Sequence, residues 1–389
     1  MKKKLIALIL AVIMTATMVP SVFASSNDTI TLVIDGVTIG TDVAPVLVSG
    51  TTLVPLRVIS ETLGAEVEWN GTTQRATIRT AAYTVVFTIG SKTFTVNGSN
   101  RTLLEAPRIV SSRTLVPIRA FAEAIGATVG YNATTHTATV DYFTKMSGSI
   151  IVTGSTTVQP IAQAAADKLV KMNSGLSITV SGGGSGAGVT AARNGTAHIG
   201  MSSRELTATE LSTLHAYPVA NDGVAIVVHP SNTVGNLTTT QARDIFAGTI
   251  TNWKDVGGSD AAILVQTRET GSGTLDTLNG LLMTGGTSVV STASPHNSNP
   301  LLRTAVAGSR NAIGFVSVGY LDSTVKALMI GGRTPTNTTI ANKTYALSRF
   351  IYVCTNGRAS GVNAMFIDYL RSKDCQDNIV TGEGFVKLS

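Results

Sequence analysis

Three short segments of the chain place glycines and small hydroxyl residues where a predicted strand gives way to a helix. They are Gly154-Ser155-Thr156-Thr157, Gly182-Gly183-Gly184-Ser185-Gly186-Ala187-Gly188 and Gly271-Ser272-Gly273-Thr274. The start of a helix exposes unpaired backbone N–H groups and the positive end of the helix dipole, so it attracts anions. Glycine lets the backbone approach an anion closely, and a hydroxyl adds one more donor. Taken singly, the first segment is more typical of an ordinary helix cap, and the alternative for the second is a flexible linker, against which its flanking strand and helix argue.

Arg268 strengthens the anion interpretation because it follows the apolar strand predicted over 263–266 and stands four residues before Ser272. A guanidinium presents a planar fork of donors that suits a tetrahedral oxyanion, although a single arginine is as often a surface residue. A dinucleotide site fits poorly, since no acidic residue ends a second strand about 20 residues later. The nucleophile elbow G-x-S-x-G is missed, because Ala187 stands at its last position. Together the segments predict one cage of donors around a small oxyanion.

The region from Ser149 onward alternates apolar strand-like runs with helical stretches. Strands are predicted over 150–152, 178–180, 198–201 and 224–228, and helices over 158–172 and 187–194. Such alternation predicts an α/β fold with a largely parallel sheet. In such sheets ligands bind beyond the carboxyl ends of the strands, which is where the glycine-rich turns fall.

The first third of the chain repeats itself at an offset of 62 residues. The landmark pairs are Asp35-Gly36 and Asn97-Gly98, Ala44-Pro45 and Ala106-Pro107, Thr52–Arg57 and Thr114–Arg119, Gly64-Ala65 and Gly126-Ala127, and Asn70 and Asn132. A constant offset over several landmarks indicates a tandem duplication. Each copy predicts a hairpin, then a helix that begins near Pro55 or Pro117, then a short strand pair. We therefore expect a small duplicated α+β domain over 25–145.

The N-terminus has the pattern of a secretory signal. Three lysines precede an apolar run that ends near Met18, and Val22-Phe23-Ala24 provides small residues before a cleavage site, which predicts a signal peptide over 1–24. The alternative is a membrane anchor, for which the run is short. No cysteine follows the run, so we expect a secreted protein, at the cell surface or in a periplasm, without a lipid anchor. Removing the three lysines lowers the net charge of +6 by three, which argues against a nucleic-acid partner.

The two cysteines, Cys354 and Cys375, allow two interpretations. In an oxidising compartment they form a disulfide, and otherwise they are two buried free thiols. The five histidines show no spacing typical of metal ligands, so we predict neither a metal nor a cofactor.

Residues 30–142 resemble the N-terminal domain of copper amine oxidases, and the LVPLR and LVPIR stretches carry the resemblance. The chain lacks the paired histidines that a copper site needs, so the resemblance implies no oxidase chemistry. We interpret this region as an accessory module that contacts the cell wall, and the alternative is a spacer.

Residues 149–389 resemble the phosphate-binding proteins of Pst-type ABC transporters. The resemblance rests on seven ordered motifs: GSTTVQPI (154–161), GGGSGAG (182–188), HIGMSSREL (198–206), DGVAIVVHP (222–230), DIFAGTITNWKDVGG (244–258), RETGSGT (268–274) and AIGFVSVGYL (312–321). It implies the two-lobed fold of a type II periplasmic binding protein. The first lobe is then expected over 149–225 and 348–389, and the second over 226–347.

The resemblance also implies ligand contacts. Those that match family positions are Thr156, Thr157, Ser185, Arg268, Ser272, Gly273 and Thr274, and Ser155 is a neighbouring candidate. Ser203 stands where many members have an aspartate. That departure matters because the O–H of protonated phosphate needs an acceptor, which sulfate does not. The acceptor is then the Ser203 hydroxyl or another carboxylate, and we hypothesise Asp222.

These observations favour a non-enzymatic, monomeric receptor that captures inorganic phosphate and delivers it to an ABC permease in the membrane. Three alternatives stay open: a receptor for another tetrahedral oxyanion such as sulfate, a hydrolase of phosphate esters, and a wall-associated phosphate scavenger or scaffold. The hydrolase is the weakest of these, because no serine has an obvious histidine partner and no catalytic residue is predicted.

Overall fold

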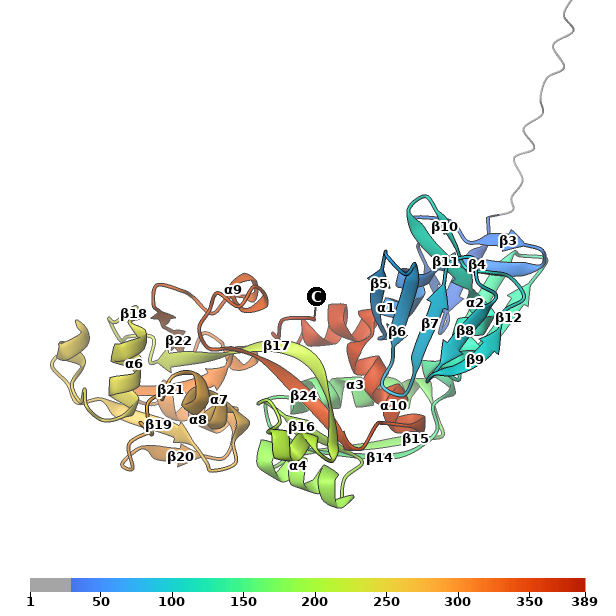
Figure 1. Ribbon diagram of the computed structural model, residues 1–389. Helices are drawn as coiled ribbons and strands as arrows, with labels where there is room; N and C mark the ends of the chain where they lie inside the picture. Colours follow the sequence, from blue (N-terminus) through green and yellow to red (C-terminus); the bar gives the residue numbers. More distant parts are fainter. Residues whose placement is uncertain (1–28, 389) are drawn as a thin grey trace, which may run out of the picture.

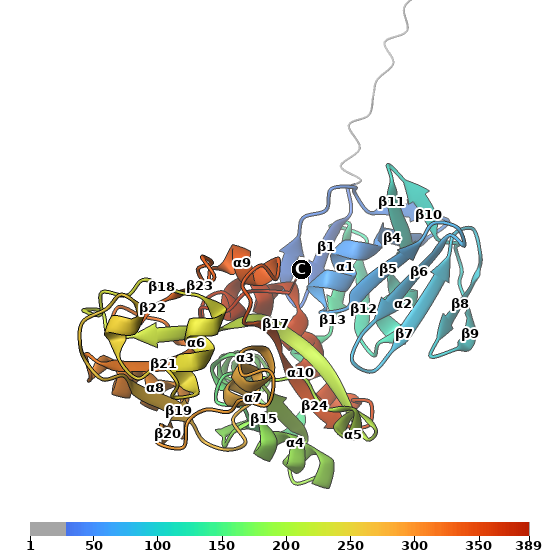
Figure 2. The ribbon, with the colours of Figure 1, turned by 60° about the vertical axis from the view of Figure 1, so that its left-hand side comes forward.

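The computed structural model describes residues 29–388, and the predicted signal peptide over 1–24 lies outside them. Three bodies follow one another along the molecule: an N-terminal module (29–145), a first lobe and a second lobe (Figure 1). In both ribbon views the N-terminal module sits on the side of the first lobe that is remote from the second lobe (Figure 2).

The N-terminal module contains two series of elements that correspond at the offset of 62. The first series is β1 (Thr31–Ile34), β2 (Val37–Ile39), β3 (Val46–Val48), β4 (Thr51–Pro55), α1 (Leu56–Thr62), β5 (Glu66–Asn70) and β6 (Arg75–Arg79). After the connecting strand β7 (Thr84–Thr88) the second series is β8 (Thr93–Val96), β9 (Ser99–Thr102), β10 (Arg108–Val110), β11 (Arg113–Pro117), α2 (Ile118–Ala124), β12 (Thr128–Asn132) and β13 (Thr137–Asp141). Pro55 and Pro117 immediately precede the helices, where the fixed φ of proline suits the first turn.

The two copies exchange strands. The hairpin β1–β2 of the first copy joins β13–β12 of the second, while β8–β9 of the second copy joins β6–β5 of the first through β7. The central sheet has the order β10-β11-β4-β3, and Val54 of β4 lies opposite its repeat equivalent Val116 of β11. The copies are therefore related by an approximate twofold axis at this pair, and each outer sheet needs strands from both copies.

The two lobes share one continuous sheet. The first lobe contributes β14 (Gly148–Gly154), α3 (Gln159–Met172), β15 (Leu176–Gly182), α4 (Ser185–Asn194), β16 (Ile199–Ser202), α5 (Ala208–Leu211), β24 (Ser348–Asn356) and α10 (Gly361–Arg371). The second contributes β18 (Asn236–Leu237), α6 (Thr239–Phe246), β19 (Leu264–Arg268), α7 (Gly273–Leu281), β20 (Ser294–His296), α8 (Asn299–Ala307), β21 (Ala312–Ser317), β22 (Lys326–Ala327), β23 (Met329–Ile330) and α9 (Asn337–Ala341). The long strand β17 (Leu214–Val228) belongs to both lobes.

The order of this sheet corrects the expectation of a largely parallel one. Strands β15, β14 and β16 run parallel in the first lobe, and β21, β19 and β20 run parallel in the second. Between them β24 and β17 pair antiparallel with each other and with their outer neighbours, because these are the strands that cross between the lobes. Strand β17 pairs with β24 up to Gly223 and with β21 from Val224, two residues before the predicted lobe boundary at 225/226.

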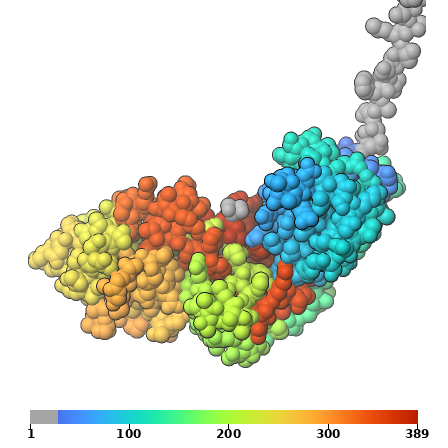
Figure 3. Space-filling view, viewed as in Figure 1, coloured from blue at the N-terminus to red at the C-terminus, as the bar shows by residue number. Residues whose placement is uncertain are grey.

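The hydrophobic core joins the N-terminal module to the first lobe. One buried cluster includes Ile78 and Phe121 of the module together with Ile161 of α3 and Phe366 of α10, whereas the second lobe has a cluster of its own. The surface view shows the module and the first lobe in continuous contact (Figure 3). The module and the first lobe are therefore packed as one body.

A buried carboxylate lies at the junction of the module with the first lobe. Asp368 of α10 is fully buried, and its two oxygens accept hydrogen bonds from the Ala81 N–H at 2.7 Å and from the Tyr142 hydroxyl at 2.9 Å. Burial raises the pKa of Asp368 to about 7, although both hydrogen bonds act in the opposite direction. Gly64 packs so closely against the Asp368 carbonyl that no side chain fits there.

Among residues 29–388, no helix combines the length and the apolar character that crossing a membrane requires.

Replacing Asp368 with asparagine is expected to change how stability depends on pH. A carboxyl whose pKa rises from its ordinary value to about 7 on folding stabilises the folded state below pH ~4, and this contribution is lost as the pH rises toward 7. It amounts to roughly 4 kcal/mol at most. In Asp368→Asn the amide oxygen can still accept the Ala81 N–H, but the titrating carboxyl is gone. The free energy of unfolding of the variant should therefore fall less between pH 4 and 8 than that of the unmodified chain.

Urea unfolding at several pH values measures this difference. The exposed Asp255→Asn variant is the control and should follow the unmodified chain. Parallel pH profiles for Asp368→Asn and the unmodified chain would contradict the prediction.

Candidate functional site

The first predicted segment lies at the carboxyl end of β14, at the edge of the first lobe that faces the second. Ser155 and Thr157 are buried, and Thr156 is half-buried. The Ser155 Oγ accepts a hydrogen bond from the Thr157 N–H at 3.1 Å, which holds the turn in shape before α3 begins.

The glycine-rich segment brings α4 against the same turn. Gly183 and Gly184 have φ values of 144° and 90°, which only glycine adopts readily, and α4 begins directly afterwards at Ser185. At Gly188 a Cβ would lie 2.6 Å from the Gly154 Cα, so the absent side chain permits the close packing of helix on strand. The buried Ser185 Oγ accepts a hydrogen bond from the Ser203 N–H at 2.9 Å and lies 3.3 Å from the Ser203 Oγ.

The third segment comes from the second lobe. Arg268 ends β19, and Ser272 caps α7, its Oγ accepting a hydrogen bond from the Leu275 N–H. Gly273 and Thr274 form the first turn of α7, and both are buried. Their backbone N–H groups belong to the first turn of the helix, whose N–H groups form no hydrogen bonds within the helix.

The structure brings all three segments together across the junction of the lobes. The Thr157 Oγ1 lies 3.2 Å from the Thr274 Oγ1, and an Arg268 Nη2–H donates to the Thr156 Oγ1 at 3.3 Å. The Gly186 N–H donates to the Gly271 carbonyl at 3.0 Å. The nine predicted ligand contacts therefore form one connected cluster in which the lobes touch.

Arg268 is the unusual member of this cluster. Its side chain is 2% exposed, and Nε and Nη2 both donate to the Glu269 carboxylate, at 2.9 and 3.0 Å. Its Nη1 is buried and has no hydrogen-bond partner among residues 29–388. A buried N–H group without an acceptor costs free energy, so this atom marks the place where a bound acceptor would be stabilised most.

Asp222, the predicted acceptor for a ligand O–H, is fully buried and already engaged. Its Oδ1 accepts a hydrogen bond from the Ser317 hydroxyl at 2.7 Å, and its Oδ2 accepts from the Arg349 Nε at 2.8 Å. The role of Asp222 toward a ligand stays a prediction. To bind a ligand O–H, one of its oxygens would have to accept a second hydrogen bond besides that from Ser317 or Arg349.

Arg349 is the residue that sequence reasoning missed. It lies on the crossover strand β24, and its Nη1 donates to the Ser203 carbonyl of the first lobe at 2.6 Å and to the Gly273 carbonyl of the second at 3.1 Å. Burial lowers the pKa of Arg349, and the charge of Asp222 opposes that change. Arg349 thus connects the two lobes through hydrogen bonds to a backbone carbonyl of each. The sequence offered one indication of its importance, namely that Arg349 is the charged residue in the otherwise mainly apolar run 348–354.

Two further missed residues support the turn at Thr157. The buried Asn299, at the start of α8, donates from Nδ2 to the Thr157 Oγ1 at 2.9 Å and accepts from the Ser317 N–H at 3.2 Å. The Tyr320 hydroxyl donates to the Thr156 carbonyl at 2.6 Å. Asn299 lies in none of the recognised motifs, whereas Tyr320 lies in the motif over 312–321 and was not chosen because its side chain is not a typical anion donor at a helix start.

The disulfide interpretation is wrong for this structure, because Cys354 and Cys375 are both buried free thiols. Cys354 belongs to a small cluster against α4, whereas Cys375 lies in the large core shared with α3 and α10. Burial raises the pKa of Cys354 to about 12 and also raises that of Cys375, so both thiols stay protonated. Within residues 29–388, no group of three or more His, Cys, Asp or Glu side chains is arranged to hold a metal ion.

Comparisons with known proteins match two families in the same order along the chain, with an overlap at 132–140. Residues 132–374 match the PBP superfamily domain, and residues 33–140 match the copper amine oxidase N-terminal domain. The phosphate-binding protein PstS of Bacillus subtilis is 32% identical over 249 residues, which are 63% of this chain and 82% of that protein. PstS of Borreliella burgdorferi is 28% identical over 257 residues, 61% of this chain and 90% of that protein.

Solved structures agree with these relatives. A substrate-binding protein from Clostridium perfringens, solved with bound phosphate, is 34% identical, with a TM-score of 0.60 over 62% of this chain and 100% of its own. An ABC-type phosphate transport receptor from Vibrio cholerae is 37% identical, with a TM-score of 0.55 over 61% of this chain and 100% of its own.

Adding a methyl group at Gly273 should prevent the lobes from meeting. A Cβ there would overlap the Ser185 Oγ and lie 2.6 Å from the Ser203 Oγ, both in the opposite lobe. Gly273→Ala is expected to separate the lobes and increase the radius of gyration measured by small-angle X-ray scattering. Gly280→Ala, on the same helix with open space around it, is the matched control and should scatter like the unmodified chain. Equal scattering from both variants would refute the proposed contact.

Removing Arg349 should be costly because it leaves Asp222 buried without its cation. Arg349→Met is expected to lower the free energy of unfolding by about 3–5 kcal/mol. The double variant Arg349→Met/Asp222→Asn should recover much of this loss, because no unpaired charge then remains buried. Chemical denaturation of the single and double variants measures the coupling, and strictly additive losses would contradict it.

Proposed function

Because the chain belongs to the PBP superfamily, and within it to the family of PstS phosphate-binding proteins, we propose that residues 149–389 capture inorganic phosphate outside the cytoplasm and deliver it to an ABC permease. This family consists of substrate-binding proteins, so the proposed activity is binding and release, without catalysis. The two proposed lobes, 149–225 with 348–389 and 226–347, close on the anion by a hinge movement about the crossover strands β17 and β24.

The observation that carries this proposal is the Arg268 Nη1, which has no partner in the described part of the chain and is buried where the hydroxyl-rich turns of both lobes meet. Charge-assisted hydrogen bonds from a guanidinium to a phosphate oxygen are among the stronger ones in proteins. The Glu269 carboxylate holds the rest of this guanidinium in place, so little conformational entropy is lost on binding.

The remaining proposed contacts supply donors from both lobes. On the first lobe these are Ser155, Thr156, Thr157 and Ser185, with Ser203 as a further contact, and on the second they are Ser272, Gly273 and Thr274. The start of α7 adds two backbone N–H groups and the positive end of the helix dipole. An anion held in this way would stabilise the closed arrangement, because it satisfies donors of both lobes at once.

Selection of phosphate over sulfate requires an acceptor for the phosphate O–H. The Ser203 hydroxyl is favoured over Asp222, because the two Asp222 oxygens already accept from Ser317 and Arg349. Within residues 29–388 the Ser185 Oγ is the one hydrogen-bond partner of the Ser203 Oγ, and one hydroxyl of such a pair keeps a free acceptor position.

The N-terminal module is proposed to contact the cell wall and so to keep the receptor near its permease. Its packing on the first lobe through Asp368 and a shared core supports this role, because a rigid attachment transmits position better than a flexible spacer. The chain is proposed to act as a monomer.

Replacing Arg268 with alanine tests the proposed function. Arg268→Ala is expected to weaken phosphate binding at least about 100-fold, because a buried charge-assisted contact is lost. Isothermal titration calorimetry with phosphate measures the change. Arg243→Ala, a partly exposed arginine on α6 of the same lobe, is the control and should bind like the unmodified chain.

The same titration with sulfate separates the two anions. We expect no measurable heat with sulfate at concentrations that saturate the site with phosphate. If sulfate binds as tightly as phosphate, the protein is a receptor for tetrahedral oxyanions without selectivity for phosphate. If Arg268→Ala binds phosphate as tightly as the unmodified chain, the proposed site is wrong.

A further inference from the structure

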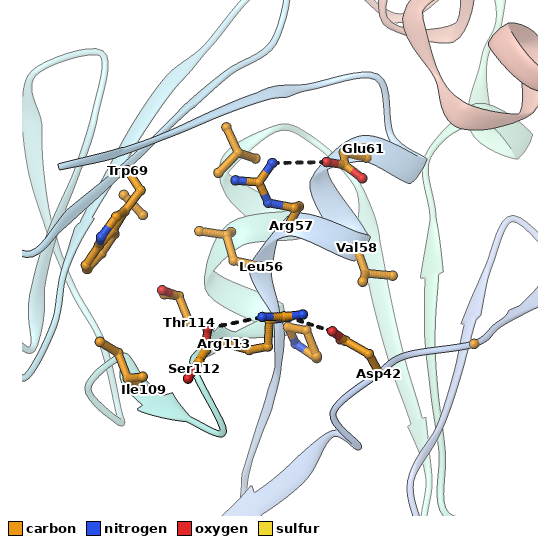
Figure 4. Close-up of a pocket in the computed structure, with 14 residues that line it drawn as sticks. Asp42, Leu56, Arg57, Val58, Glu61, Trp69, Ile109, Ser112, Arg113 and Thr114 are labelled. Carbon is orange, nitrogen blue, oxygen red and sulfur yellow. Dashed lines mark hydrogen bonds and ion pairs between the residues drawn. The ribbon is translucent and has the colours of Figure 1, made fainter. Parts of the chain in front are cut away.

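The N-terminal module contains a groove of ≈ 880 Å³ that the phosphate site does not use (Figure 4). Trp69 of β5 and Ile109 of β10 lie along one side of it, and Leu56, at the start of α1, lies between its two sides. The Trp69 and Ile109 side chains are 41% and 50% exposed, so both present apolar surface to the groove. The groove therefore offers a partly uncovered aromatic face beside an aliphatic one.

The opposite side of the groove is polar and balanced in charge. Arg57 pairs with Glu61 at 3.5 Å, and Arg113 pairs with Asp42 at 2.6 Å (Figure 4). All four side chains are about half exposed, so they can still hydrogen-bond to a ligand. The whole segment 29–145 has nine Lys and Arg residues against eight Asp and Glu. Such a surface does not attract a strongly charged polymer.

The duplication repeats the same side chains at a second position. Tyr131 and Leu47 are the repeat equivalents of Trp69 and Ile109, and they are 39% and 54% exposed. The ion pair of Arg119 with Glu123, at 3.3 Å, corresponds to that of Arg57 with Glu61. The approximate twofold axis at Val54 and Val116 relates the two sets. Both copies therefore carry an exposed aromatic and an exposed aliphatic residue at equivalent positions, although the core does not require either.

From these observations we propose that the groove binds an uncharged glycan strand. A sugar ring has an apolar C–H face that stacks on an aromatic side chain, and a rim of hydroxyl groups that both donate and accept hydrogen bonds. Trp69 provides the stacking face, while arginine and carboxylate pairs provide donors and acceptors side by side. A polymer of repeating sugars also suits two equivalent positions on one module, where binding at the first raises the effective concentration at the second.

The two positions are not identical. Thr51 and Leu104 replace Arg113 and Asp42 in the second set, so only the first has the additional ion pair. We therefore expect the Trp69 position to bind more tightly than the Tyr131 position. The groove is formed only by residues between 40 and 114, so its occupation leaves the junction of the lobes free.

Tryptophan fluorescence of the intact chain tests this proposal. The chain has two tryptophans, Trp69 and Trp253, and the second is only 2% exposed. Titration with the β-1,4-linked hexasaccharides of N-acetylglucosamine and of glucose should shift the emission of Trp69 to shorter wavelength and reduce its quenching by acrylamide. Heparin hexasaccharide, a strongly anionic glycan of similar length, should produce no change.

Variants then locate the site, with affinity measured by calorimetry. Trp69→Ala is expected to weaken oligosaccharide binding at least about tenfold, Trp69→Phe by less, and Tyr131→Ala by less than Trp69→Ala. Leu264→Ala, an exposed apolar residue of the second lobe, is the control and should change nothing. Phosphate affinity should be the same in all four variants, so failure of the glycan proposal and failure of phosphate capture give different results.

Three outcomes would overturn the proposal: no response to either uncharged hexasaccharide at millimolar concentration, unchanged affinity in Trp69→Ala, or a dimer in sedimentation that Trp69→Ala abolishes. The last outcome would assign the groove to a second copy of the chain.

Discussion

Two arginines are buried where the lobes meet, and a buried guanidinium is tolerated only where its N–H groups find acceptors. Arg349 meets this requirement by contacting Asp222 and backbone carbonyls of both lobes. Arg268 meets it only in part, because its Nη1 is left without a partner among the described residues. The first arginine therefore connects the two lobes, and the second leaves one buried donor free at the proposed anion site. Both effects follow from the same desolvation cost.

The junction between the N-terminal module and the first lobe depends on a different buried charge. Asp368 is surrounded by groups from both parts, and the core around it is continuous. The module is consequently packed as one body with the first lobe, and its groove lies apart from the proposed phosphate site. The proposed glycan groove and the proposed anion site share no residue, so occupation of one would leave the other open.

Much of the architecture could be predicted from the sequence. Periodic apolar runs predicted α3, α4 and β14 to within a few residues, and the offset of 62 predicted the corresponding elements of the two copies. The strand exchange between the copies was not predictable, because equivalent strands have the same local pattern whichever partner they pair with. The antiparallel crossing of β17 and β24 escaped prediction for a similar reason, since direction depends on connections and not on composition.

The sequence by itself determined the chemistry that is available: glycines and hydroxyls at helix starts, Arg268 beside them, and a duplicated module ahead of them. These features are local, so spacing along the chain reveals them. Only the tertiary structure decided which groups meet, that Arg349 and Asn299 support the cluster, that the two cysteines stay apart, and that Trp69 of one copy shares a groove with Ile109 of the other. The physical reason is that burial and hydrogen-bond partners depend on residues far away in the chain, and a local pattern contains no record of them.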